Sequence, residues 1–347
     1  MVALLVLSVL APHKVSSYPG LVNWPTIATL LGLMILTKGV ELSGWLYRFG
    51  RQIIMGIDNQ RMLALFLVAA SALLAMLLTN DIALFIVVPL TLGLGQLAEL
   101  PLRRLVIFEA LAVNAGSMLT PIGNPQNIFL WQLSGVRFDG FMLHMLPPFL
   151  IASGCLLLLT LAAFRPLRMQ VNGNPRLPPL RRPLLTASAL LYVPFLVLAD
   201  LRYAWAGLLL VTVVFLLAFP RILRQIDWAL MAVFVLMFVD LGLLARYPVL
   251  PLLDLTHTGT LYLTGVVSSQ IISNVPTAIL LTKYSSDWST IAWAVNVGSF
   301  GVVIGSLASI IALRIGRQPG SFAAFHAWSV PFFLVVGTLT YIYLQHR

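Results

Sequence analysis

The sequence predicts an all-α polytopic membrane protein, built as an inverted repeat with about nine spans, two re-entrant hairpins and two broken helices. Three observations lead to this fold class. Hydrophobic residues make up 60% of the 347 residues and charged residues only 9%, and the mean hydropathy is +0.97. Apolar runs of helical length follow one another, separated by short basic or proline-containing segments. Several short motifs recur in the same order in both halves of the chain.

Composition also excludes several classes of function. The net charge of +10 comes from basic residues between the apolar runs, which is typical of loops that orient a membrane protein and not of a nucleic-acid site. The expected surroundings are therefore a lipid bilayer, without nucleic acid. The single cysteine, Cys155, excludes an internal disulfide. There is no Walker P-loop, no His-Glu-x-x-His motif and no nucleophile set, so we expect neither an enzyme nor a resident cofactor.

In the first half, apolar runs predict spans at 2–12, 22–43 and 146–164, with a basic loop after residue 44. Two further arms, 62–78 and 82–98, meet at Thr79-Asn80-Asp81. A span at 105–134 is broken between Asn114 and Asn127, because the prolines and glycines there cannot continue a helix. Backbone left unpaired within a membrane must be buried in protein or line a wet cavity, where it can bind ions and small polar solutes.

The second half predicts spans at 184–200, 204–220, 228–244 and 326–344. Arms at 259–272 and 275–282 meet at Ser273-Asn274-Val275-Pro276 and are too short to cross a bilayer, so they form a re-entrant hairpin. A span at 290–313 is interrupted near Ile304-Gly305-Ser306.

The two halves carry the same motifs in the same order. Asn23-Trp24 matches Asp227-Trp228, the two hairpin tips match each other, and Asn114-Ala115-Gly116-Ser117 matches Asn296-Val297-Gly298-Ser299. We therefore expect a first repeat at 1–164, a cytoplasmic linker at 165–183, an extra linking span at 184–203 and a second repeat at 204–347.

Basic residues orient the chain in the inner (cytoplasmic) membrane. Most fall on the side of the linker, which the positive-inside rule makes cytoplasmic: Arg48, Arg51, Arg61, Arg103, Arg104, Arg165, Arg168, Arg176, Arg181, Arg182, Arg221, Arg224, Arg314 and Arg317. Because one unpaired span separates the repeats, the second repeat is inverted relative to the first. Inverted repeats with broken helices are typical of alternating-access carriers.

Polar residues at the hairpin tips and helix breaks are the candidate binding residues. An asparagine amide offers both an acceptor and donors, although asparagine also caps helices at turns and small residues also serve helix packing. The predicted substrate- or ion-binding set is Thr79, Asn80, Asp81, Thr120, Gly123, Asn124, Asn127, Ser273, Asn274, Thr277, Gly305 and Ser306.

Asp81 is the sharpest candidate, because an ionisable residue between apolar arms indicates a functional site. Burial disfavours the charged form of a carboxyl group, so Asp81 is expected to take up a proton or a sodium ion. The alternative is a negative charge that stabilises the start of the second arm. Lys38 and Glu41, three residues apart, are expected to pair with each other, and Lys38 could instead pair with Asp240.

At these residues the sequence resembles the ion transporter superfamily. It is most similar to the branch with arsenite permeases, NhaD-type sodium/proton antiporters and uncharacterised inner-membrane anion permeases, which share a citrate-transporter-like domain. The resemblance rests on residues 79–84, 114–127, 273–277 and 296–309. It implies a scaffold domain, a transport domain with elevator-like motion, and often a homodimer. It also implies sodium sites at Asn80 with Gly123 and Asn124, and at Ser273 and Asn274 with Gly305.

The first tip departs from the Ser-Asn-Thr pattern of di- and tricarboxylate carriers, because Asp81 stands where those carriers have a hydroxyl. This charge, with no arginine in the predicted core, disfavours a multivalent carboxylate. We therefore expect an ion-coupled secondary transporter of a small inorganic or organic anion, with sodium or a proton as the coupling ion. The alternatives are a sodium/proton antiporter and a passive channel.

Overall fold

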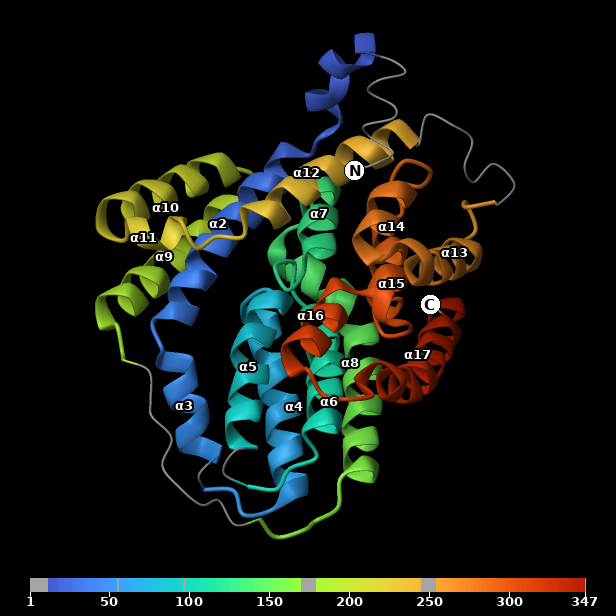
Figure 1. Cartoon of the computed structure of the whole chain (residues 1–347). Helices are drawn as coiled ribbons and strands as arrows, with labels where there is room; N and C mark the ends of the chain where they lie inside the picture. Colours follow the sequence, from blue (N-terminus) through green and yellow to red (C-terminus); the bar gives the residue numbers. More distant parts are fainter. Residues whose placement is uncertain (1–11, 55, 96–97, 170–178, 245–253, 347) are drawn as a thin grey trace.

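The structure, a computed structural model, describes residues 12–54, 56–95, 98–169, 179–244 and 254–346 (Figure 1). Within these residues the chain forms helices joined by loops, and no β-strand. Five helices are long and apolar enough to cross a membrane by length and composition. The predicted all-α polytopic membrane fold is confirmed. The expected first span at 2–12 lies almost entirely outside the described residues, as does part of the linker.

Most helices of the first half agree with the predicted spans and arms, although α8 begins well before the span predicted at 146–164, and the broken span divides into two helices. Their bounds are η1 (Pro12–Leu21), α2 (Trp24–Leu42), α3 (Trp45–Ile54), α4 (Gln60–Leu77), α5 (Asn80–Leu94), α6 (Leu102–Ser117), α7 (Pro125–Ser134) and α8 (Phe138–Ala163).

The second half likewise has a helical hairpin followed by a broken helix. Its bounds are α9 (Arg182–Asp200), α10 (Ala204–Ala218), α11 (Pro220–Leu223), α12 (Trp228–Leu244), α13 (Thr258–Ile272), α14 (Asn274–Leu281), α15 (Trp288–Val297), η2 (Val303–Gly305), α16 (Leu307–Gly316) and α17 (Ser321–Gln345).

Helix starts follow from local sequence. Asn23 caps α2, since its side chain accepts a hydrogen bond from the Thr26 N–H at 3.1 Å, and Pro25 occupies a first-turn position that needs no N–H. Asp227 does the same for α12, accepting from the Leu230 N–H at 2.8 Å. The two motifs that match between the halves therefore both serve as helix starts.

The predicted basic loop after residue 44 was wrong, because the chain forms α3 there. Trp45 and Phe49 stack one turn apart, with ring centroids 5.1 Å apart. Leu46 packs with Leu78 and Ile82 of the first hairpin. Apolar residues at helical spacing between the arginines make an amphipathic helix, which a count of charges alone does not reveal.

The helices form groups that mix the two halves of the sequence (Figure 1). α2 packs against α9 and α10 and also contacts α12, whereas α4, α5, α6 and α8 pack together. α13 packs on α15, and α17 packs on α8. α16, from the second half, packs against α5 and α6 of the first. This last contact brings the two helix breaks together and positions the candidate site.

Candidate functional site

The first hairpin tip is bonded to the first helix break. Asn80 donates its backbone N–H to the carbonyl oxygen of Gly123 at 2.8 Å, and its side-chain oxygen accepts from the Asp81 N–H at 3.0 Å. Only 4% of Asn80 is exposed. A side chain on Gly123 would collide with the backbone of Ser117, so the close turn requires glycine. The structure thus brings together Asn80 and Gly123, which the sequence predicted to share a site.

Asparagine side chains satisfy the unpaired backbone of the first break. Asn124 caps α7 by accepting from the Asn127 N–H at 2.9 Å. The side-chain nitrogen of Asn127 lies 3.0 Å from the Thr120 carbonyl oxygen and 3.1 Å from that of Met118. The Thr120 hydroxyl donates to the Met76 carbonyl at 2.8 Å, which ties the break to the end of α4. In this arrangement Thr120, Asn124 and Asn127 hold the loop in shape.

The second tip is built differently. Asn274 accepts from the Val275 N–H at 2.8 Å, and the Thr277 hydroxyl donates to the Ser273 carbonyl at 2.8 Å. Ser273 has φ +73°, a region that L-residues rarely adopt, whereas Thr79 at the first tip has φ −86°. Within the described residues no hydrogen bond joins Ser273 or Asn274 to Gly305. The predicted second grouping is therefore not bonded as the first one is.

The two breaks bind each other through one pattern used twice. Asn296, at the end of α15, donates to Asn127 at 2.7 Å and accepts from Asn124 at 2.9 Å. Asn114, at the end of α6, donates to Ser309 at 3.2 Å and accepts from Ser306 at 2.9 Å.

The same offset of 182 residues relates Asn114 to Asn296, Asn124 to Ser306 and Asn127 to Ser309. All six residues are at most 2% exposed. We call this buried network the interlock; it makes the two broken helices one packed unit.

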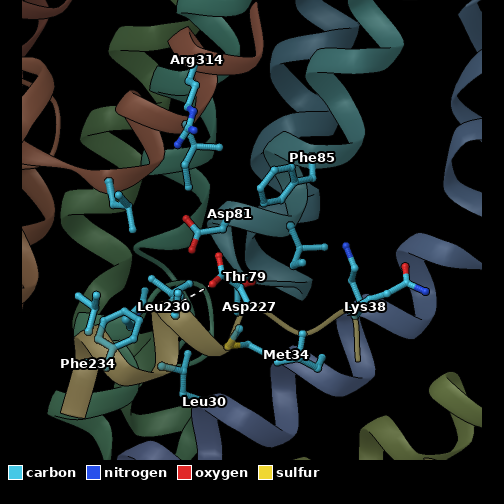
Figure 2. A pocket seen from close by; sticks show the side chains of 18 of the residues that line it. Leu30, Met34, Lys38, Thr79, Asp81, Phe85, Asp227, Leu230, Phe234 and Arg314 are labelled. Carbon is cyan, nitrogen blue, oxygen red and sulfur yellow. Dashed lines mark hydrogen bonds between the residues drawn. The ribbon is translucent and has the colours of Figure 1, made fainter. Parts of the chain in front are cut away.

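A cavity of about 1010 Å³ lies between this unit and the helices α2 and α12. Thr79 and Asp81 line it from the first tip, and Pro125 lines it from the start of α7. Figure 2 shows Asp81 and Thr79 close to Asp227, which precedes α12, and all three line the cavity. Asp81 is 9% exposed, and no described group donates a hydrogen bond to its carboxyl oxygens. Asp81 is therefore a nearly buried ionisable group that faces open space.

The other predicted site residues do not line this cavity. They lie behind it in the breaks and at the tips: Asn80, Thr120, Gly123, Asn124, Asn127, Ser273, Asn274, Thr277, Gly305 and Ser306. Among the described residues, no three His, Cys, Asp or Glu side chains gather in a metal-binding group.

Sequence reasoning missed the basic residues of the cavity. The sequence placed no arginine in the predicted core. Arg314 and Arg317, which are both exposed, nevertheless line this cavity. Figure 2 shows Arg314 and Asp81 on opposite sides of the same space. Leu307, Ile311 and Arg314 are spaced so that they lie on one face of α16. The sequence could therefore have predicted that Arg314 lies on the same helical face as Leu307, next to the second break.

Lys38 also lines the cavity, from α2. Its ammonium group bonds to Glu41 at 2.9 Å, which confirms the predicted pairing of these two residues. It lies 6.0 Å from the centre of the Phe85 ring. The positive charge of Lys38 is therefore balanced by Glu41, whereas no ion pair involves Arg314 among the described residues.

Interrupted helices, a docked hairpin tip and a cavity lined in part by charged residues are features of membrane transporters. The chain belongs to the citrate transporter family, whose sequence model matches residues 1–298. It is 44% identical to the inner membrane protein YbiR of Escherichia coli K12, over 97% of this chain and 92% of that protein. It is 28% identical to the uncharacterized transporter MJ0456 of Methanocaldococcus jannaschii, over 91% and 87%.

A shorter match, 28% identical, joins 41% of this chain to 30% of the silicon efflux transporter LSI3 of Oryza sativa subsp. japonica. The matching family and the relatives MJ0456 and LSI3 carry the names of transporters and not of enzymes. The chain is accordingly a secondary transporter and a multi-pass protein of the inner membrane, with a small molecule or ion as its substrate.

Proposed function

We propose that this protein carries a small inorganic or organic anion across the inner membrane by alternating access, coupled to a proton or a sodium ion. One observation carries the proposal: Asp81 and Arg314 line the same cavity, beside the unit formed by the two broken helices. An arginine offers several hydrogen-bond donors to an oxyanion or carboxylate. A nearly buried carboxyl group offers a site for a coupling cation.

The balance of charge in the cavity favours a small anion of low charge. Arg314 and Arg317 attract an anion, whereas Asp81 and Asp227 repel it. Binding of a proton or sodium ion at Asp81 removes part of this repulsion, so the anion binds better when the coupling ion is present. This mutual dependence is the thermodynamic requirement for coupling. A citrate-like trivalent anion needs more positive charge than the cavity offers while Asp81 is ionised.

The packing of the helices suggests which part of the protein moves during transport and along which boundary. The interlock holds both breaks together, while α2 packs with α9 and α10. The cavity lies between parts of these two groups, which also touch where α2 contacts α5 and α7. In this proposal one group slides past the other along this boundary. We assign the inverted repeats to 1–164 and 204–347, the cytoplasmic linker to 165–183 and the linking span to 184–203. A homodimer, implied by the family resemblance, belongs to the same proposal and is tested by the particle mass in detergent.

A sodium/proton antiporter is the second candidate, and one observation favours it. Asp81 and Asp227 both face the cavity, and a pair of carboxyl groups can exchange a sodium ion for protons without any anion.

Internal pH in proteoliposomes that hold the purified protein distinguishes the candidates. The vesicles are challenged in turn with sodium, lithium, arsenite, silicic acid and a panel of mono-, di- and tricarboxylates. A pH change that requires one anion supports the proposal and identifies the substrate class. A pH change driven by sodium or lithium alone supports the antiporter. A flux that does not saturate and follows only its own gradient would indicate a channel and contradict both.

Arg314→Gln is expected to weaken anion binding and raise KM by about tenfold, because a charge-assisted hydrogen bond contributes about 1.4 kcal/mol or more. Folding should change little, since Arg314 is exposed. The measurement is initial uptake rate against substrate concentration. Arg224→Gln removes the same charge from an exposed position outside the cavity and serves as the control. An unchanged KM in Arg314→Gln would remove this residue from the site.

A further inference from the structure

We call each hairpin tip with its helix break a half-site: Asn80 with Gly123 is the first, and Asn274 with Gly305 is the second. The two half-sites differ in the residue four positions before each tip. Met76 stands four residues before Asn80, and Gln270 stands four residues before Asn274. Methionine has no hydrogen-bond donor to offer to the backbone of a helix break. Glutamine has both a donor and an acceptor, and in this structure it uses both.

Gln270 reaches from α13 into the second break and bonds to it at two points. Its side-chain nitrogen donates to the Gly298 carbonyl oxygen at 2.5 Å. Its side-chain oxygen accepts from the Val302 N–H at 2.7 Å. The amide group therefore satisfies one carbonyl and one N–H that the break would otherwise leave unpaired.

The same amide occupies the space beside Gly305, the residue predicted for the second ion site. An atom at the Cβ position of Gly305 would lie 3.5 Å from the Gln270 side-chain oxygen and 3.6 Å from its nitrogen. It would also lie 2.7 Å from the Gly298 carbonyl oxygen. At Gly301, an added Cβ would lie 2.7 Å from the Gln270 amide carbon. Gly301 thus leaves the room that the amide fills, and Gly305 lies in van der Waals range of the same amide.

We propose that the Gln270 amide permanently fills the second half-site, so that ion binding is confined to the first half-site with Asp81. A cation bound at the second break would need carbonyl oxygens such as that of Gly298. In place of a cation, the NH₂ group of Gln270 presents a partial positive charge to this oxygen, and it cannot leave with the substrate. The inference rests on the proposed function for the role of the first half-site, but its own tests do not require transport.

Gln270→Glu tests the proposal by a gain of function. The substitution keeps the size of the side chain but turns a carboxylate oxygen towards the Gly298 carbonyl oxygen, and two facing oxygens repel unless a cation lies between them. The melting temperature of the purified variant in detergent at pH 8 is measured in sodium chloride and in choline chloride. We expect sodium to raise it by about 5 °C more than it does in the unmodified protein. At pH 6 this difference should shrink, because protons compete for the new carboxylate.

Gln52→Glu is the matched control, since it adds the same charge at an exposed position of α3 and should show no added response to sodium. A folded Gln270→Glu protein without an added response would overturn the proposal. Should this variant fail to fold, Asp81→Asn gives an independent test. With the first half-site disabled, the proposal expects no shift of the melting temperature with sodium. Any such shift in Asp81→Asn would reveal a second working site and overturn the proposal.

Discussion

Asp81→Asn is expected to abolish coupling while the protein still folds and inserts. Asparagine has the shape of aspartate, and no described group donates to the Asp81 carboxyl oxygens, so few contacts are lost. Asparagine cannot take up a proton, and without a charge it binds sodium weakly. Concentrative uptake in proteoliposomes should therefore fall to an accumulation ratio of about 1, the value for a solute that equilibrates without a driving ion.

Asp139→Asn is a matched control, because Asp139 is an exposed residue at the start of α8 whose partner is Arg137, at 3.6 Å. It should accumulate substrate as the unmodified protein does. Gradient-driven accumulation that persists in Asp81→Asn would contradict the role of Asp81 in coupling. Loss of all flux, including exchange of substrate at equilibrium, would assign Asp81 to substrate binding instead.

Asn296→Leu should destabilise the protein strongly, because it breaks the interlock from the inside. Leucine removes the bonds to Asn124 and Asn127 and leaves their amide groups buried without these partners. An unsatisfied buried polar group costs about 1–3 kcal/mol, so the loss of both contacts should cost about 3 kcal/mol or more. The melting temperature in detergent and the yield of inserted protein measure this effect.

Asn114→Leu occupies the equivalent position in the first half and should have a similar effect, since Asn114 bonds to Ser306 and Ser309. Ser306→Ala loses one of these bonds and should cost less, about 1 kcal/mol. The control is Asn59→Ala, which removes a helix cap at the start of α4 that is far from the breaks in the fold. A cost of Asn296→Leu no larger than that of Asn59→Ala would show that the interlock contributes little to stability.

Much of the fold could be predicted from the sequence because hydropathy and helix-breaking residues act locally. The span predicted at 22–43 became α2 (Trp24–Leu42), and the break predicted after Asn114 separates α6 from α7. Proline and glycine cannot continue a helix whatever surrounds them, so these boundaries needed no knowledge of packing. α3 was missed because its amphipathic pattern is short and lies among arginines.

Within the candidate site, the contact between Asn80 and Gly123 could be anticipated, because the resemblance to the ion transporter superfamily implies a site that these two residues share. The role of Gln270 could not. Nothing in the spacing of Gln270 indicates that its side chain crosses to the backbone of Gly298 and Val302. Gln270 makes this contact only because α13 packs on α15 and ends beside η2.

By itself, the sequence determined the helices, their interruptions and the repeat of motifs, because each depends on the cost of exposing polar backbone to hydrocarbon along one stretch of chain. Which polar groups face the cavity and which bond to one another within the packed helices depends on how the helices come together in space. Asp81 and Arg314 meet the same open space, whereas Asn124, Asn127 and Asn296 bond to one another. The amide group of an asparagine at a helix break can bind either an ion or another amide group. Which of the two it binds depends on the side chains that the neighbouring helix places beside it.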